Sequence, residues 1–199
     1  MRLLLSIIVL VNLFSAHNCL KASNKEHNIK PFIGRIAQGG SFSFDDYLNA
    51  KALAIVFTCN HCPFAQLYID RMNAFHQKYA PQGIPLIAIN PMDSLVYDDE
   101  TFSLMQQKAQ KEHFLFPYVH DVDQSIARMF GAEHTPQVFV IQKFDSTWRI
   151  VYKGIIDDNG KEPEKAIPYL QKTADAILQH QTIAPATLKS FGCKIYYRK

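Results

Sequence analysis

The sequence of 199 residues predicts an α/β fold whose mixed sheet is parallel at its centre, with a C-terminal β-hairpin and helices on both faces. Two continuous apolar runs, residues 53–57 and 84–90, are typical of central strands covered on both sides. Between them, residues 63–80 repeat apolar side chains at helical spacing. Residues 137–142 and 147–153 flank a short turn and predict an antiparallel pair. Strands and helices that alternate before a final hairpin indicate a parallel centre.

The remaining elements follow from local signals along the chain. Residues 42–44 alternate like a short strand, and the Asp45-Asp46 pair is suited to cap a helical turn after it. Gly83 ends the helix that begins at Pro63. Further along, the pattern predicts helices over residues 101–113, 124–130 and 164–180 and a short strand over residues 117–120.

Composition and charge exclude several classes of protein. The apolar fraction of 48% is ordinary for a packed chain and excludes general disorder. The net charge of +3 falls to +1 once residues 1–22 are set aside, because that segment holds Arg2 and Lys21 and no acidic residue. Nucleic-acid-binding proteins usually carry a strong basic excess, so we expect no nucleic-acid partner.

The N-terminal segment has the pattern of an export signal. Met1-Arg2 precedes an apolar run over residues 3–14, which is shorter than the ~20 residues that span a bilayer. We therefore expect residues 1–22 to be a signal peptide or an N-terminal anchor, and the protein to be exported to the periplasm or another extracytoplasmic space. Cleavage after Ala16 and lipid attachment at Cys19 are both imperfect matches, so soluble and membrane-anchored forms stay open.

The rest of the chain is short enough for one domain. We expect this domain to occupy residues 30–183, followed by a C-terminal tail over residues 184–199 that carries Cys193. Export would place the chain where disulfides persist, and Cys59, Cys62 and Cys193 would remain in the mature protein.

Cys59 and Cys62 form a C-x-x-C motif at the junction between a predicted buried strand and the helix that follows it. Proline is favoured at the first helical position, so Pro63 makes Cys62 the N-cap residue, beside free backbone N–H groups. A helix N-terminus contributes ~0.3–1 kcal/mol and one pKa unit is worth ~1.36 kcal/mol, so the cap lowers the thiol pKa by about one unit at most. A larger decrease needs further groups, of which a protonated His61 is one candidate.

A C-x-x-C motif has three interpretations: a redox-active pair, half of a zinc site, or an inert structural disulfide. A zinc site needs a second ligand pair at similar spacing, and the chain offers only Cys193 and scattered histidines. We therefore favour the redox-active pair and predict no metal and no other cofactor.

The motifs resemble those of the thioredoxin-fold superfamily, because the strand, C-x-x-C and helix are followed much later by Thr135-Pro136 at the start of a strand. More narrowly, the chain looks like the peroxiredoxin-like members of the AhpC/TSA, or redoxin, group. The segments that carry this likeness are TCNHCPFAQ, AINP, TPQVFV, GIIDD and SFGCKI. The resemblance covers residues 30–199 and implies a thioredoxin-like fold and thiol redox chemistry.

The resemblance also implies roles for the motif residues. Cys62 takes the nucleophile position, which is the peroxidatic position of peroxiredoxins, and Cys59 becomes the resolving cysteine. The helix-cap argument points to Cys62 independently. His61 is similar to the intervening histidine of oxidising periplasmic thiol enzymes, which stabilises the thiolate, although a solvent-exposed loop histidine is the plainer interpretation.

The chain departs from peroxiredoxins at three positions. Cys59 stands where they carry Thr or Ser, Ile55 stands where they carry Pro, and Thr135-Pro136 replaces an arginine near the later strand. Those groups activate and orient the peroxide, so their absence argues against fast peroxide reduction. Thr135-Pro136 instead fits the cis-proline loop of thioredoxins, where the backbone pairs with a bound substrate strand. An ordinary trans proline at a strand start is the alternative.

Two further residues are candidates for the same site. His134 lies beside Thr135 and is a candidate for the substrate groove, although most such histidines are ordinary core or surface residues. Cys193 has basic neighbours and is either a second resolving thiol or a cysteine without a redox role.

Three functions compete on these observations. The leading one is an exported thiol–disulfide oxidoreductase that works through Cys59 and Cys62, with protein or small-molecule thiols and disulfides as substrates and an unidentified redox partner. The second is a thiol peroxidase in which Cys62 reacts with peroxide and Cys59 or Cys193 resolves the sulfenic acid. The third is a copper-binding protein similar to the Sco-type chaperones, whose two cysteines are one residue further apart.

Overall fold

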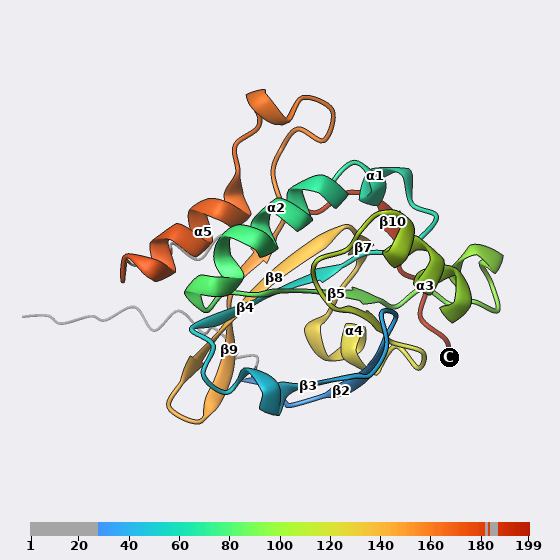
Figure 1. The fold of residues 1–199 in the computed structure, drawn as a ribbon, viewed down its shortest axis with the longest axis horizontal. Coiled ribbons are helices and arrows are strands. Elements are labelled where there is room, and N and C mark those ends of the chain that lie inside the picture. The colour runs from blue at the N-terminus through green and yellow to red at the C-terminus, as the bar shows by residue number, and fades with distance from the viewer. Residues whose placement is uncertain (1–27, 182, 184–186) are drawn as a thin grey trace, which may run out of the picture.

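The computed structural model describes residues 28–181, 183 and 187–199 (Figure 1). The expected signal or anchor segment lies outside these residues. Within them, the main sheet has the strand order β1-β9-β8-β4-β5-β6-β2-β3, and a second, two-stranded sheet pairs β10 with β7. Figure 1 shows helices α2 and α5 on one face of the main sheet and helix α4 on the other. No helix in the described ranges is both long and apolar enough to cross a membrane.

The strands are β1 (Asn28–Ile29), β2 (Ile33–Ile36), β3 (Ser41–Ser43), β4 (Ala52–Phe57), β5 (Leu86–Asn90), β6 (Tyr118–His120), β7 (His134–Thr135), β8 (Gln137–Phe144), β9 (Thr147–Gly154) and β10 (Cys193–Lys194). The α-helices are α1 (Pro63–Gln66), α2 (Ile69–Tyr79), α3 (Phe102–Lys111), α4 (Ser125–Phe130) and α5 (Tyr169–Leu178). Short 3-10 helices are η1 (Phe44–Tyr47), η2 (Ala80–Gln82), η3 (Asp98–Glu100) and η4 (Pro163–Lys165).

The predicted mixed sheet with a parallel centre is confirmed. Strand β5 lies between β4 and β6 and is parallel to both. Strand β8 pairs antiparallel with the other edge of β4 and then forms the predicted hairpin with β9. Because β4 is at the centre of the sheet, the loop that follows it leaves from the middle of the molecule.

Side chains of β4 alternate between two hydrophobic cores. Ala52, Ala54 and Val56 face a core that includes Met72 and Phe75 of α2, which we call the α2 core. The odd-numbered residues of the strand face the other side of the sheet. There Leu53, Ile55 and Phe57 pack into the α4 core, together with Ile126, Ala127 and Phe130. Burial on both faces explains why this strand has no polar alternation in sequence.

Two predicted helices are shorter than expected. The helix predicted over residues 63–80 is divided into α1 and α2 by a turn at Leu67 and Tyr68. The helix predicted over residues 164–180 starts at Tyr169, since Pro168 disfavours helical backbone at the residue before it.

The sequence pattern did not predict several short strands. Strands β1, β2, β7 and β10 have two to four residues each, too few to establish a pattern. The strand predicted over residues 42–44 is displaced to Ser41–Ser43, and Phe44 begins η1 instead.

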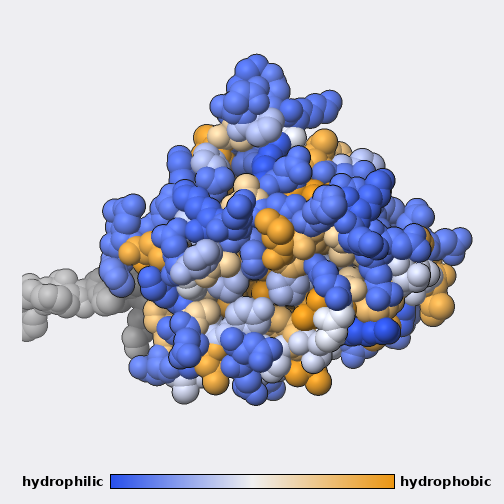
Figure 2. Space-filling view, viewed as in Figure 1, coloured by the Kyte–Doolittle hydropathy of each residue, from blue (hydrophilic) through white to orange (hydrophobic). Residues whose placement is uncertain are grey.

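The surface drawn in Figure 2 is largely hydrophilic, with hydrophobic side chains in separate patches. Phe64 and Leu67 of the α1 region and Phe191 of the C-terminal tail are among the exposed apolar residues. Phe64 and Phe191 meet edge to face with ring centroids 5.8 Å apart. The tail therefore packs directly on the helix that follows the C-x-x-C motif.

We expect Leu53→Ala to lower the free energy of unfolding of the reduced protein by about 2–5 kcal/mol, because it leaves a cavity in the α4 core. Leu53 is fully buried, whereas Leu95 is 83% exposed. Leu95→Ala is the matched control, with an expected change within about 0.5 kcal/mol. Urea denaturation measures both, and equal effects would contradict the assigned core.

Candidate active site

The C-x-x-C loop begins where the central strand β4 ends. The backbone N–H of Thr58 still donates to the Ile89 carbonyl at 2.9 Å, and Cys59 follows it out of the sheet. Cys62 is the N-cap of α1 with extended backbone angles of −66° and 116°, and Pro63 is the first helical residue, as the sequence predicts. Both cysteines are fully buried in the α4 core.

Thr135 holds the two sulfurs from the far side of the site. Its hydroxyl Oγ1 lies 3.1 Å from Cys59 Sγ, and its carbonyl oxygen accepts a hydrogen bond from Cys62 Sγ at 3.1 Å. The Thr135-Pro136 peptide bond is cis. The predicted loop residues Thr135 and Pro136 therefore do meet the C-x-x-C motif, across more than seventy residues of sequence.

Cys193 completes a group of three sulfurs. It lies on β10 directly opposite Thr135 in the antiparallel pair with β7. Residues directly opposite each other in an antiparallel pair point to the same face, so the Cys193 side chain lies on the side where Thr135 meets the cysteines. The Thr135 carbonyl oxygen lies 3.1 Å from Cys62 Sγ, so β10 brings Cys193 to the same residue that meets the Cys62 sulfur.

The three thiols differ in acidity. Hydrogen bonds from the Cys59 thiol, the Cys193 thiol and the backbone of Ala65 and Cys193 lower the pKa of Cys62, against the effect of burial. The Thr135 carbonyl opposes this decrease, because it accepts a hydrogen bond from Cys62 only while that thiol is protonated. The net effect of these groups is a lowered pKa for Cys62.

The pKa values of the other two thiols move in the opposite direction. The hydrogen bond to Cys62, burial and the charge of Glu100 raise the pKa of Cys59. Burial and the Cys62 sulfur raise the pKa of Cys193. One thiolate between two protonated thiols is the arrangement that a nucleophile with two candidate resolving partners requires.

Glu100 is a site residue that sequence reasoning missed, because it stands in an acidic run, Asp98-Asp99-Glu100, typical of a loop or cap. It is fully buried beneath the C-x-x-C loop. Its oxygens accept hydrogen bonds from the backbone N–H groups of Asn60 and His61 at 2.9–3.0 Å and from the Asn90 side chain at 2.6 Å. The carboxylate thus fixes the two residues between the cysteines.

His61 is directed toward Glu100. Its Nδ1 atom lies 2.5 Å from Glu100 Oε1, and its ring stacks on Tyr97 with centroids 4.6 Å apart. Donor atoms of Cys59, His61 and Glu100 lie within 4.8 Å of one another, which is the spacing of a candidate metal-binding group. Both Glu100 oxygens already accept hydrogen bonds from the loop, so this acid is engaged in holding the backbone.

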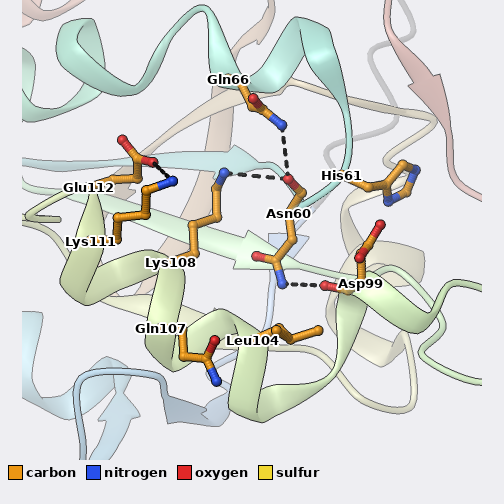
Figure 3. Close-up of a pocket in the computed structure, with 9 residues that line it drawn as sticks. All are labelled: Asn60, His61, Gln66, Asp99, Leu104, Gln107, Lys108, Lys111 and Glu112. Atoms are coloured by element: carbon orange, nitrogen blue, oxygen red, sulfur yellow. Dashed lines mark hydrogen bonds and ion pairs between the residues drawn. The ribbon is translucent and has the colours of Figure 1, made fainter.

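A hollow of about 490 Å³ lies on the outer side of the loop, between Asn60 and helix α3 (Figure 3). Figure 3 shows the side chains of Gln66 and Lys108 both pointing to the Asn60 carbonyl. Burial lowers the pKa of Lys108. The hollow is polar and is lined by His61 but by none of the three cysteines, so it borders the site without exposing a sulfur.

His134, the other predicted groove residue, lies on β7 beside Thr135. Its Nδ1 atom is 3.2 Å from the Ser190 hydroxyl, and its backbone pairs with Lys194. The contacts of this histidine are therefore with the C-terminal tail.

Comparison with known proteins places the chain among redoxins. The sequence model of the AhpC/TSA family matches residues 26–147. A hypothetical protein from Sinorhizobium meliloti is 28% identical, with a TM-score of 0.77 over 87% of this chain and 94% of that one. An uncharacterized conserved protein from Geobacillus kaustophilus is also 28% identical, with a TM-score of 0.76 over 87% of this chain and 92% of that one.

A more distant structure shares the fold. A thiol:disulfide interchange protein of the thioredoxin family from Chlorobium tepidum is 18% identical, with a TM-score of 0.51 over 60% of this chain and 81% of that one. Among curated proteins, none matches the chain in sequence.

We expect Cys59→Ala to raise the pKa of Cys62 more than Cys193→Ala does, because the Cys59 thiol is the strongest of the donors to the Cys62 sulfur. Thiolate absorbance in the ultraviolet, followed through a pH titration of the reduced protein, measures both. Cys62→Ser identifies the signal, since it removes this thiolate. A Cys62 pKa unchanged by Cys59→Ala would contradict the hydrogen-bonded arrangement.

Proposed function

The chain belongs to the AhpC/TSA family and is a redox enzyme of thioredoxin-like fold, and from this premise we propose that it exchanges disulfides through Cys59 and Cys62. Cys62 is the nucleophile and Cys59 the resolving cysteine. The substrates are thiols and disulfides of proteins or small molecules.

One observation carries the proposal: Thr135 contacts both sulfurs, with its hydroxyl 3.1 Å from Cys59 Sγ and its carbonyl 3.1 Å from Cys62 Sγ, while Cys62 is the N-cap residue of α1. A thiolate attacks disulfides and a thiol does not, so the lowered pKa of Cys62 makes it reactive at neutral pH. The proton on Cys59 keeps the second cysteine unreactive until the first has formed its mixed disulfide. Cys62 therefore attacks first, on the substrate disulfide, and Cys59 attacks second, on the mixed disulfide.

The exchange then runs in two steps. The Cys62 thiolate attacks one sulfur of a substrate disulfide, forms a mixed disulfide, and releases the other substrate sulfur as a thiolate that takes up a proton. Cys59 then gives up its proton and attacks Cys62 Sγ, which releases the second substrate thiolate. This second thiolate also takes up a proton. The substrate thus gains two electrons from the protein and two protons, one given up by Cys59 and one from solvent, and the protein is left with a Cys59–Cys62 disulfide. The same steps in reverse oxidise a dithiol.

Peroxide reduction is the second candidate, because the family match favours it. Cys62 would attack the peroxide, become a sulfenic acid, and lose water when Cys59 forms the disulfide. The position of the peroxide-activating hydroxyl is taken by Cys59, and Thr135 places its own hydroxyl on Cys59, 3.1 Å from that sulfur. Disulfide exchange therefore remains the leading proposal.

Copper binding is the remaining candidate from the sequence, and the cluster of Cys59, His61 and Glu100 favours it. Titration of the reduced protein with copper separates it from the redox proposal. A stoichiometric charge-transfer band would support binding, and its absence would close this option.

We extend the proposal to location: the enzyme is exported and acts outside the cytosol. Support comes from the apolar run over residues 3–14 after a basic start, which lies outside the described residues. Export would place the Cys59 and Cys62 pair where disulfides persist.

We expect Cys62→Ser to abolish reduction of a model disulfide such as insulin by the full chain, whereas Cys59→Ser should accumulate a mixed disulfide at Cys62 that turns over slowly. The difference follows from the roles of nucleophile and resolving cysteine. Mass spectrometry of acid-quenched mixtures identifies the adduct. A Cys62→Ser protein that still turned over substrate would contradict the assignment of Cys62 as the nucleophile.

A further inference from the structure

Because the reactive pair is buried, the proposed function needs a route by which external thiols reach it. Cys59 and Cys62 are both fully buried, so in this structure no external thiol reaches the sulfur of either residue. Cys193 is the third member of the sulfur group and is partly exposed. Its strand partner Thr135 contacts the Cys62 sulfur.

The C-terminal tail is held at this position by its own contacts. The Ile195 N–H donates to the Glu133 carbonyl at 2.9 Å, and the Arg198 N–H donates to the Gln124 side chain at 2.8 Å. The Arg198 guanidinium also pairs with the carboxylate of Asp93. The tail is therefore part of the fold, and it occupies the edge of β7 next to the cis-proline.

Gly192 shows how closely the tail approaches. Its φ of +139° disfavours other residues, and a Cβ atom built there would lie 2.2 Å from the Thr135 carbonyl oxygen. That carbonyl is the one that accepts the hydrogen bond from Cys62. Glycine at this position allows the tail to approach Thr135 so closely that Cys193 pairs with it.

We propose that Cys193 is the entry point for external thiols: it exchanges into the Cys59–Cys62 disulfide to form a Cys62–Cys193 disulfide, which is then opened from the exposed side. This rests on the proposed redox role of Cys59 and Cys62. The observation that carries it is a partly exposed cysteine on a strand that pairs directly with Thr135, the residue whose carbonyl oxygen lies 3.1 Å from Cys62 Sγ.

The chemistry needs no oxidant beyond the oxidised pair. The Cys193 thiol loses its proton and attacks Cys62 Sγ; a bond forms between these sulfurs, the Cys59–Cys62 bond breaks, and Cys59 takes up a proton. An external thiolate next attacks Cys193 Sγ and expels Cys62 as a thiolate. A second external thiolate frees Cys193, which is reprotonated. The external thiols leave as a disulfide, and the two electrons they lose reduce the protein.

The different pKa values of the three cysteines favour attack of the external thiolate on Cys193, with Cys62 as the leaving group. A disulfide is opened faster when the departing sulfur has a low pKa and the attacked sulfur is accessible. Cys62 is the acidic thiol and Cys193 the accessible one. Attack at Cys193 therefore combines the better leaving group with the one cysteine of the three that is not fully buried in the described chain.

The first test traps the intermediate. In Cys59→Ser full-length protein, mild oxidation with diamide should link Cys62 to Cys193, and trypsin should release residues 52–71 joined to residues 190–194. Adding Gly192→Ala should strongly reduce this link, because the substitution displaces the tail from Thr135. Tyr196→Ala, a change at an exposed side chain of the same tail, is the control and should leave the yield unchanged.

The second test is kinetic. Oxidised wild-type and Cys193→Ser proteins are mixed with glutathione, and the remaining Cys59–Cys62 disulfide is counted by alkylation and mass spectrometry. We expect Cys193→Ser to slow the reduction by about tenfold or more, because access to the attacked sulfur is lost. Circular dichroism of both proteins checks that the fold is retained.

The outcomes separate this inference from the proposed function. If the wild-type protein forms the Cys59–Cys62 disulfide but Cys59→Ser gives no link to Cys193, or Cys193→Ser is reduced at the wild-type rate, the entry role is wrong and disulfide exchange stands. If the wild-type protein forms no Cys59–Cys62 disulfide at all, the proposed function itself fails.

Discussion

The site depends on Thr135, a single residue that contacts the C-x-x-C motif through its side chain and its backbone. The hydroxyl meets Cys59, the carbonyl meets Cys62, and the strand edge pairs with Cys193. Because β7 leads through a cis peptide bond into β8, and β8 pairs directly with β4, the residue is fixed by the same sheet that carries the motif. Three sulfurs from two distant parts of the chain are thereby brought to one point.

Electrostatic interactions act differently on the two cysteines of the motif. The Cys62 thiolate is stabilised by donors around its sulfur, whereas Glu100 lies under the loop, satisfies two backbone N–H groups and raises the pKa of Cys59. A buried carboxylate is costly unless it is hydrogen-bonded, and here the backbone N–H groups of Asn60 and His61 and the side-chain amide of Asn90 donate to it. The acid thus favours a protonated Cys59 and holds the loop in the shape that places Cys62 at the helix start.

The sequence alone predicts the parts of this arrangement that have local signals. Continuous apolar runs predicted β4 and β5, and Pro63 predicted the cap position of Cys62, because each depends on neighbours in the chain. Glu100 and β10 were missed for the opposite reason. The role of Glu100 arises only where the end of β5 meets the end of β4, and a two-residue strand such as β10 has no periodicity to detect. The pairing of Cys193 with Thr135 is likewise set by the fold, as is the break of the predicted helix at Tyr68.

The central claim is that this redoxin has a dithiol pair for disulfide exchange in place of a peroxide-reducing centre. The most direct test is the rate at which the fully reduced protein reacts with hydrogen peroxide, followed by the fluorescence of its single tryptophan, Trp148. The account predicts a rate similar to that of an ordinary free thiol. A rate far above it would make the protein a peroxidase despite Cys59, Ile55 and Thr135-Pro136, and would contradict the assignment.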